Sequence, residues 1–313
     1  MHDTIAQIQQ LHSIIGREEE LELSLIAAGA GKHILLSGTV GVGKTTIAMA
    51  VASHLGRNCL RIDGDERYTE QKLAGWFDPP LVMAKGYTKE AFIQGALTLT
   101  MEEGSILLLN ELNRMPEGTQ NVLLSAMDEK KIYIPKYGKV EGKEGFLIIA
   151  TQNPDEYIGT SQLSEALKDR FICITLFNQT EDEEIEIVKL RSRCPDEQII
   201  TLSVIFTRLT RDKQAIRRGS SIRGAIDLAD IFYSANKSFN DNPEAWVKCA
   251  KLAFSTKIEL NDFSHDNFLE LLKKLALMSL EKYKQRLTSP KRDVSANTTA
   301  TPSDFDGDQK KNY

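Results

Sequence analysis

The chain has 313 residues, of which 41% are hydrophobic and 27% are charged, and its formal net charge is −5. At roughly 150 residues per domain this length predicts about two domains, each large enough to bury a core. The apolar fraction excludes a wholly disordered chain, and no apolar run approaches the roughly 18 residues of a membrane helix. The mildly acidic total argues against a protein that mainly coats nucleic acid.

The first residues lack the basic and then apolar pattern of a secretory signal. The four cysteines lie far apart without a C-x-x-C pair, which is typical of a reducing compartment and excludes a zinc ribbon or disulfide scaffold. The histidines do not fall at metal-ligand spacing, and no G-x-S-x-G motif is present. We therefore expect a cytoplasmic protein with no membrane segment.

Five short apolar segments predict strands, at residues 32–38, 59–64, 105–110, 146–151 and 171–176. The segments 105–110 and 146–151 are apolar without alternation, as expected for strands buried on both faces of a parallel sheet. Helical patterns lie between the strands, notably at 45–54 and 119–129. This alternation predicts a doubly wound α/β domain over residues 1–178.

The pattern changes after residue 178. Thr180 and Glu183 form a predicted capping box that opens a helix through residue 193. From there to about residue 286 the periodicity is helical with no convincing strand, which predicts an all-α domain over 179–287. Residues 288–313 are rich in Ser, Thr, Asn, Pro, Asp and Lys, and we expect a disordered tail without a role of its own.

A phosphate-binding loop is the strongest motif in the sequence. Residues 38–45 read GTVGVGKT, which fits G-x-x-x-x-G-K-[ST], and the motif follows a predicted strand and opens a predicted helix. Glycines let the backbone N–H groups turn toward the phosphates, Lys44 neutralises phosphate charge and the Thr45 hydroxyl binds Mg²⁺. The predicted nucleotide-binding residues are Gly38, Thr39, Val40, Gly41, Val42, Gly43, Lys44, Thr45 and Thr46.

The strand at 105–110 ends in Asn110 and Glu111, the position where a hydrolytic site needs an acid beside the loop. Asn110 stands where an aspartate is usual; its carbonyl oxygen can accept a hydrogen bond from a metal-bound water, but it brings no negative charge. We therefore expect Mg²⁺ to be held by Thr45 and Asn110, less tightly than usual. Glu111 is the candidate general base that polarises the attacking water.

Five further segments resemble MoxR-type AAA+ ATPases, of the branch that carries an insert in its second helix. They are the acidic-motif segment ELNRMP with residues 119–127, ATQNP at 150–154, LSEALKDRF at 163–171, GSSIRGA at 219–225 and IIGRE at 14–18. The resemblance covers about residues 12–285. It implies an AAA+ P-loop fold with an all-α lid, ATP and Mg²⁺ as ligands, and a ring, presumed hexameric.

The resemblance also assigns roles to three residues. Asn153 would position the attacking water or sense the γ-phosphate, Arg170 would act as an arginine finger in a neighbouring subunit, and Arg223 would contact nucleotide from the lid. A planar guanidinium suits a transferring phosphoryl group. For Arg170 a structural ion pair with Asp169 or Glu165 stays an alternative. Arg217 and Arg218 compete with Arg223 for its role.

Two insertions offer contact surfaces. Residues 75–82 include Trp76 and Phe77, which either bind a partner or pack the insert's own core. A predicted hairpin at 130–143 carries five lysines, which either contact DNA phosphates in a pore or form a solvated face offset by neighbouring acids. We favour the solvated face, because basic and acidic residues interleave; the lysines are Lys130, Lys131, Lys136, Lys139 and Lys143.

The sequence thus predicts an ATP-hydrolysing chaperone that remodels or activates partner protein complexes. By the resemblance its partners are a separate protein with a von Willebrand A-type domain and a client enzyme complex. Two alternatives stay open: a DNA-remodelling AAA+ motor, motivated by the lysine hairpin, and an ATP-gated scaffold with little turnover, motivated by Asn110.

Overall fold

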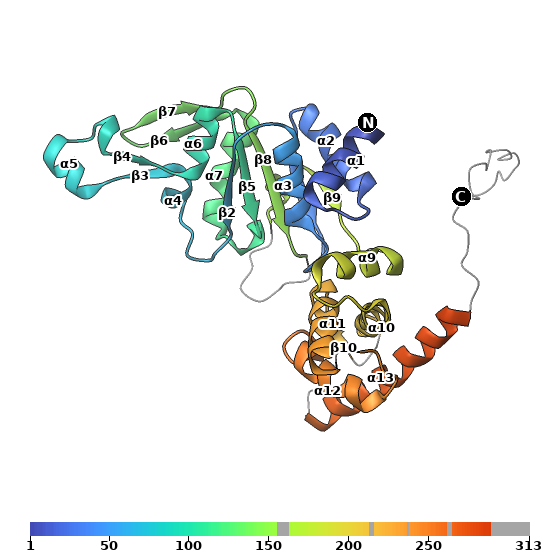
Figure 1. Cartoon of the computed structure of the whole chain (residues 1–313). Helices are drawn as coiled ribbons and strands as arrows, with labels where there is room; N and C mark the ends of the chain where they lie inside the picture. The colour runs from blue at the N-terminus through green and yellow to red at the C-terminus, as the bar shows by residue number, and fades with distance from the viewer. Residues whose placement is uncertain (155–162, 213–215, 237, 262–264, 289–313) are drawn as a thin grey trace, which may run out of the picture.

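The computed structural model describes residues 1–154, 163–212, 216–236, 238–261 and 265–288 (Figure 1). Its centre is a five-stranded sheet in which every pair of neighbours is parallel. The carboxyl ends of all five strands therefore lie at one edge. The strand order is β2 (Cys59–Asp63), β5 (Ile106–Asn110), β8 (Leu147–Gln152), β1 (His33–Ser37) and β9 (Phe171–Thr175). These strands confirm the five predicted ones to within one residue at each end.

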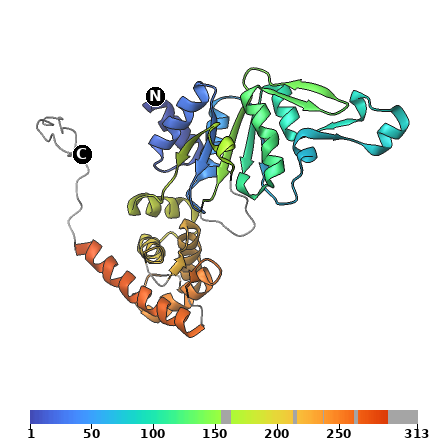
Figure 2. The ribbon, with the colours of Figure 1, turned by 180° about the vertical axis from the view of Figure 1, so that it is seen from behind.

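Helices cover both faces of this sheet, as Figures 1 and 2 show. Side chains alternate along β1: Ile34 and Leu36 join the core on one face and Leu35 joins the core on the other. The first face is covered by α1 (His2–His12), α2 (Glu18–Gly29) and α3 (Lys44–His54). The second is covered by α4 (Glu70–Ala74), α6 (Ala96–Glu103), α7 (Glu117–Asp128) and α8 (Glu165–Lys168), with the short 3₁₀ turn η2 (Leu112–Arg114).

Two antiparallel hairpins extend from this half at the side of β2 (Figure 1). In the first, Phe77 packs edge-on against Phe92 and Tyr87, as one of the two interpretations predicted, whereas Trp76 is 39% exposed. The ring of Phe92 also stacks on Tyr137 of the second hairpin, with centroids 4.0 Å apart. The elements are β3 (Gly75–Phe77), α5 (Pro79–Lys85), η1 (Lys89–Ala91) and β4 (Phe92–Gln94), then β6 (Lys131–Ile134) and β7 (Gly138–Glu141).

The C-terminal half is a helical lid with its own apolar cluster, centred on Trp246, which stacks on Phe232 at 3.8 Å between ring centroids. The capping box of Thr180 and Glu183 is confirmed at the start of the first helix. The prediction of no strand here is wrong, because Ile216–Arg218 (β10) pairs with Glu259–Leu260 (β11). Strands of three and two residues are too short to produce a periodic pattern. The helices are α9 (Glu181–Arg191), α10 (Glu197–Leu209), α11 (Ile222–Asn236), α12 (Pro243–Phe254) and α13 (His265–Thr288).

The apolar clusters support the expected division of the chain, since one spans residues 185–283 and the other two span residues 5–176. The boundary at residue 178 itself stays a prediction. Residues 289–313 of the predicted tail lie outside the described residues, and Thr288 is the last residue of α13. None of the described helices has the length and apolar character needed to cross a membrane.

Candidate functional site

The phosphate-binding loop connects the fully buried strand β1 to helix α3. Gly41 and Gly43 have φ values of +88° and +95°, which glycine adopts without the steric cost of a Cβ. Gly43 is the N-cap of α3, so the positive end of the helix dipole faces the loop. This arrangement is an anion site built from backbone, as the motif predicts.

The side chains of the loop have different surroundings. The Nζ atom of Lys44 donates to the carbonyl oxygens of Gly38 at 2.6 Å and Thr39 at 2.8 Å, so the ammonium lies over the loop. Val42 is buried in the apolar core beneath the sheet, whereas Val40 and Thr46 are exposed. The side chain of Val42 therefore anchors the loop, and only its backbone can face a phosphate.

A chain of hydrogen bonds joins the loop helix to two strand ends. Thr45 Oγ1 donates to Asn110 Oδ1 at 2.8 Å, and Thr151 Oγ1 donates to the same oxygen at 3.0 Å. Asn110 Nδ2 donates to Asp63 Oδ1 at 2.7 Å. Because Thr45 gives its proton to Asn110, its oxygen keeps lone pairs for a cation, and oxygen ligands are those that Mg²⁺ prefers. The residues present therefore fit a Mg²⁺–nucleotide complex.

Glu111 follows β5 with a left-handed backbone, φ 57° and ψ 51°. Its backbone N–H donates to Thr151 Oγ1 at 2.9 Å, and its Oε2 pairs with Arg114 Nε at the same distance. The Glu111 side chain is 37% exposed, so a water molecule can approach it. Glu111 thus lies one residue beyond Asn110, as the sequence predicts, and an ion pair fixes its carboxylate.

Asn153 follows β8 directly and accepts a hydrogen bond at its carbonyl oxygen from Asn113 Nδ2 at 3.3 Å. The strand β8 lies between β1 and β5, so Asn153 shares the carboxyl edge of the sheet with the loop and with Glu111. The structure therefore brings four predicted site residues to one edge: Lys44, Thr45, Asn110 and Glu111, with Asn153 beside them.

Arg170 lies at the opposite edge, since it precedes the first residue of β9. Five residues of strand, about 17 Å at 3.3 Å per residue, separate the two edges. Neither Asp169 nor Glu165 holds this side chain, contrary to the alternative considered from the sequence: Arg170 Nε donates to Asp128 Oδ2 at 2.7 Å. This bond raises the pKa of the Arg170 guanidinium further above its ordinary value.

Arg223 is the second residue of α11 and is exposed. The start of this helix touches the loop, because a Cβ on Gly41 would lie only 2.6 Å from Ser221 Cβ. Its rivals lie in β10, where Arg218 pairs with Glu259 at 2.8 Å. Burial first, and the charge of Arg223 second, lower the pKa of Lys257, so the Arg223 guanidinium lies near this lysine.

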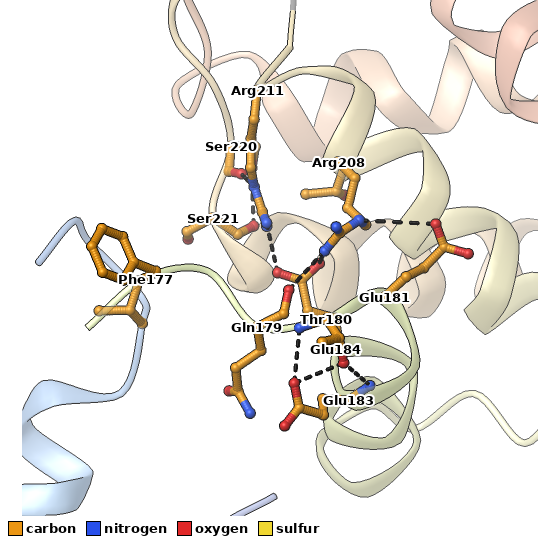
Figure 3. Close-up of polar contacts among 12 residues, drawn as sticks. Phe177, Gln179, Thr180, Glu181, Glu183, Glu184, Arg208, Arg211, Ser220 and Ser221 are labelled. Atoms are coloured by element: carbon orange, nitrogen blue, oxygen red, sulfur yellow. Dashed lines mark hydrogen bonds and ion pairs between the residues drawn. The ribbon is translucent and has the colours of Figure 1, made fainter. Parts of the chain in front are cut away.

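A buried carboxylate that the sequence analysis did not identify fixes this part of the lid. Glu184 is 3% exposed and bonds to Arg208 at 3.0 Å and Arg211 at 2.6 Å (Figure 3). Arg211 Nε also donates to the carbonyl oxygen of Ser220 at 2.8 Å, and Arg208 Nη1 donates to that of Gln179 at 2.9 Å. The three charges therefore tie the segment before α11 to the connection that leaves β9.

Arg17 links the same connection to the loop. Its guanidinium donates to the carbonyl oxygens of Val42 at 3.0 Å and Phe177 at 2.6 Å, although the residue is only 8% exposed. Arg17 lies in the segment IIGRE, which resembles the family, but Glu18 and two further glutamates follow it directly, so nothing in the local sequence marked it for this role.

Comparisons with known proteins agree with this architecture. A family model described as an AAA domain of the dynein-related subfamily matches residues 33–171. An uncharacterized protein of Staphylococcus epidermidis is 31% identical over 206 residues, 64% of this chain and 78% of that protein. The gas vesicle ATPase GvpN1 of Halobacterium salinarum is 34% identical over 175 residues, 51% of this chain and 50% of that protein.

Among solved structures, the Holliday junction branch migration motor RuvB of Thermotoga maritima matches with a TM-score of 0.50 and 23% identity, over 76% of this chain and 70% of that one. This likeness concerns the fold alone. Together with the matched domain model, the parallel sheet, the phosphate-binding loop and the helical C-terminal region show the family. The chain belongs to the AAA+ ATPases.

Proposed function

We propose that this chain is a MoxR-type AAA+ ATPase that hydrolyses ATP with Mg²⁺ and remodels or activates partner protein complexes as a hexameric ring. The observation that carries the proposal is the carboxyl edge of the sheet, where the loop, Thr45, Asn110 and Glu111 meet. The relative named a gas vesicle ATPase supports hydrolysis as the reaction.

In this proposal each residue has a stated task. Lys44 leaves the carbonyl oxygens of Gly38 and Thr39 for the β- and γ-phosphates, and the first turn of α3 binds phosphate oxygens. Glu111 accepts the proton of the attacking water, and Asn153 orients that water. Bound Mg²⁺ supplies positive charge that stabilises the developing charge on the phosphates.

The ion pair between Glu111 and Arg114 implies a resting state of the base. At 2.9 Å, Arg114 Nε occupies Glu111 Oε2, one of the two oxygens that can accept a hydrogen bond from the attacking water. In this proposal Glu111 exchanges Arg114 for that water before it acts. Both side chains are more than one third exposed, so this exchange needs only rotamer changes.

Assembly follows from the place of Arg170. Because Arg170 lies at the edge of the sheet opposite to the loop, it serves the site of a neighbouring subunit rather than its own. Such a head-to-tail contact closes into a ring when its rotation permits. The proposed partners are a separate protein with a von Willebrand A-type domain and a client enzyme complex.

A protein client is favoured over DNA by the contacts of the lysine hairpin. Lys139 pairs with Glu141 at 2.5 Å, and Lys136 Nζ lies 5.9 Å from the centre of the Tyr87 ring. A lysine that is neutralised by an acid on its own strand releases few counterions from a phosphate backbone. The DNA-motor alternative predicts salt-sensitive DNA binding that is lost when Lys136 and Lys139 are replaced.

The ATPase rate of the purified wild-type chain tests the proposal. We expect Mg²⁺-dependent turnover that Glu111→Gln lowers by at least about a hundredfold, the usual contribution of a general base. The matched control Glu117→Gln, an exposed carboxylate at the start of α7, keeps the wild-type rate. Background turnover in the wild type would contradict hydrolysis and favour the ATP-gated scaffold.

The client is identified by co-purification with the Glu111→Gln variant. This variant is expected to stay in its ATP state, so partners that bind this state accumulate on it. The same experiment with Lys44→Ala, which weakens phosphate binding, is the negative control. A protein captured by both variants is independent of nucleotide and does not qualify as the client.

A further inference from the structure

The site carries a charge deficit at the end of β5. Asn110 stands where the family resemblance places an aspartate, and an amide cannot contribute the negative charge that favours a divalent cation. Thr45 is neutral as well. The other carboxylate at this edge, Glu111, is paired with Arg114 at 2.9 Å, so a further carboxylate would bring the cation site nearer to its usual charge.

Asp63 has the position for this task. It is the last residue of β2, and the register of the sheet pairs it directly with Asn110. The two side chains are hydrogen-bonded, with Asn110 Nδ2 and Asp63 Oδ1 2.7 Å apart. The Oδ1 atom of the same Asn110 amide accepts a hydrogen bond from the Thr45 hydroxyl at 2.8 Å. Asn110 therefore links Asp63 to Thr45.

Gly64 makes this close approach possible. A Cβ at this position would lie 2.1 Å from the carbonyl oxygen of Glu111, so a larger residue would push the end of β2 away from β5. The backbone N–H of Gly64 also donates to the carbonyl oxygen of Asn110 at 2.7 Å. The ladder between the two strands therefore continues past their last residues and fixes the Asp63 carboxylate beside the site.

Asp63 also fixes the orientation of the Asn110 amide. A carboxylate only accepts hydrogen bonds, so it selects the NH₂ side of the amide, and the Oδ1 atom must face the hydroxyls of Thr45 and Thr151. An aspartate carboxylate is ionised at neutral pH, so Asp63 brings a negative charge to this hydrogen-bonded pair.

We propose that Asp63 is a positioning residue for Mg²⁺: it supplies, from the neighbouring strand, the carboxylate charge that Asn110 lacks, and it orients the Asn110 oxygen toward Thr45. The inference rests on the proposed function as a Mg²⁺–ATP site. It makes the pair of Asp63 and Asn110 the functional equivalent of one aspartate at the end of β5.

A purely structural role for Asp63 is the competing explanation. Arg61 bonds to Asp63 Oδ1 at 2.6 Å, but both side chains are about half exposed, and such surface pairs contribute little to stability. If the role of Asp63 is purely structural, replacing it weakens nucleotide binding to the same extent with and without Mg²⁺. The two explanations therefore separate in a metal-dependence measurement.

The test exchanges the carboxylate and the amide between positions 63 and 110. The dissociation constant of a non-hydrolysable ATP analogue, adenosine 5′-(β,γ-imido)triphosphate, is measured by calorimetry with saturating MgCl₂ and with EDTA. The dissociation constant in EDTA divided by the constant in MgCl₂ gives the coupling between Mg²⁺ and nucleotide. The proteins are the full-length wild type, Asp63→Asn, the double variant Asp63→Asn/Asn110→Asp, and the control Asp65→Asn, whose carboxylate pairs with Arg67.

We expect Asp63→Asn to reduce this ratio about tenfold, the lower end of the loss that follows removal of an outer partner of a metal site. The double variant restores it, because the residue at 63 then donates the same hydrogen bond to a carboxylate at 110. Asp65→Asn keeps the wild-type ratio. The double variant also shows whether any loss in the single variant comes from misfolding.

Two results overturn the inference by itself. One is an unchanged ratio in Asp63→Asn when the wild type binds the analogue in a Mg²⁺-dependent manner. The other is a double variant that folds as the wild type does but keeps the loss. A wild type that does not bind the analogue, or binds it without regard to Mg²⁺, overturns the proposed function and the inference together.

Discussion

The α/β half and the helical lid use charged residues differently. At the carboxyl edge of the sheet the charged groups are open to solvent: the Asp63 side chain is 63% exposed and that of Glu111 is 37% exposed. In the lid the central carboxylate, Glu184, has a side chain that is 4% exposed and is held by two arginines. Exposed charges can meet a ligand, whereas a buried one can only shape the fold around it.

The two halves also differ in how their polar groups are held. The sheet edge is held rigid by five parallel strands, so its exposed side chains keep their geometry. Among the described residues, the lid meets the α/β half where Ser221 lies against Gly41, where Gln179 Nε2 donates to the carbonyl oxygen of Ile15 at 2.6 Å, and where Glu183 lies beside Gly16. The lid residue that touches the loop, Ser221, directly follows Ser220, which the network of Glu184 and Arg211 holds.

The largest expected effect is in the lid. Glu184→Gln removes the charge between Arg208 and Arg211 and leaves Arg211 without its carboxylate partner and Arg208 with only its longer pair to Glu181 at 3.9 Å, so the lid loses about 3 kcal/mol of its free energy of unfolding. Hydrogen exchange of α10 and α11 measures this loss region by region, which a single melting temperature of a two-part chain does not.

The matched control is Glu186→Gln on the same helix. Glu186 pairs with Lys189 at 3.0 Å at an exposed position, and such pairs contribute at most about 1 kcal/mol. Equal exchange rates in the Glu184→Gln and Glu186→Gln variants would show that the buried network does not hold the lid. Faster exchange in the sheet as well as the lid would show that the two halves are stabilised jointly.

A smaller effect, confined to the α/β half, is expected from pH. His33 in β1 is 6% exposed; burial, followed by the charges of Lys130 and Lys32, lowers its pKa to about 4. Its Nδ1 accepts a hydrogen bond from the N–H of Ile148 at 2.9 Å, which requires a neutral ring. Asp128 opposes the shift and does not cancel it.

The sign of the pH effect follows from linkage. Because the pKa of His33 is lower in the folded chain than its ordinary 6.5, the unfolded chain takes up the proton first as the pH falls. Stability contributed by the neutral ring is thus present above pH 6.5 and is lost toward pH 4. We expect about 2 kcal/mol of loss between pH 7 and pH 5, measured by denaturant unfolding. His33→Gln removes this dependence; an equal pH slope in the variant would contradict the assignment.

Regular features of the α/β half could be predicted from the sequence because they are local. Strands buried on both faces read as unbroken apolar runs, and the phosphate-binding loop is a contiguous motif. The position of Glu111 after β5 followed from the same logic. In the lid the capping box at Thr180 was found for the same reason, since its two residues are three positions apart.

The features that were missed depend on neighbours that are distant in the sequence. Asp63 and Asn110 are 47 residues apart and meet only because β2 and β5 are adjacent in a strand order that the sequence does not reveal. Glu184 and Arg211 are 27 residues apart. For Arg170 the alternative to an arginine finger was an ion pair with the nearby Asp169 or Glu165, yet its partner Asp128 lies 42 residues away. The packing of strands and helices in three dimensions, not local spacing, selects such pairs.

The smallest change in stability is expected at Arg170, whose pair with Asp128 is 29% and 44% exposed. Arg170→Ala should cost less than about 1 kcal/mol of unfolding free energy, although removal of an arginine that reaches a neighbouring site lowers ATP hydrolysis at least about a hundredfold.

Mixing two inactive variants tests in which subunit Arg170 acts. Arg170→Ala subunits keep an intact loop, and Lys44→Ala subunits keep the arginine, so mixed rings regain turnover at the interfaces that combine both. Two inactive variants that stay inactive after mixing, under conditions in which they co-assemble, would place the action of Arg170 within its own subunit. Since the strand β9 separates Arg170 from its own loop, that result would require a rearrangement of the sheet edge, and recovery on mixing is the outcome that the geometry favours.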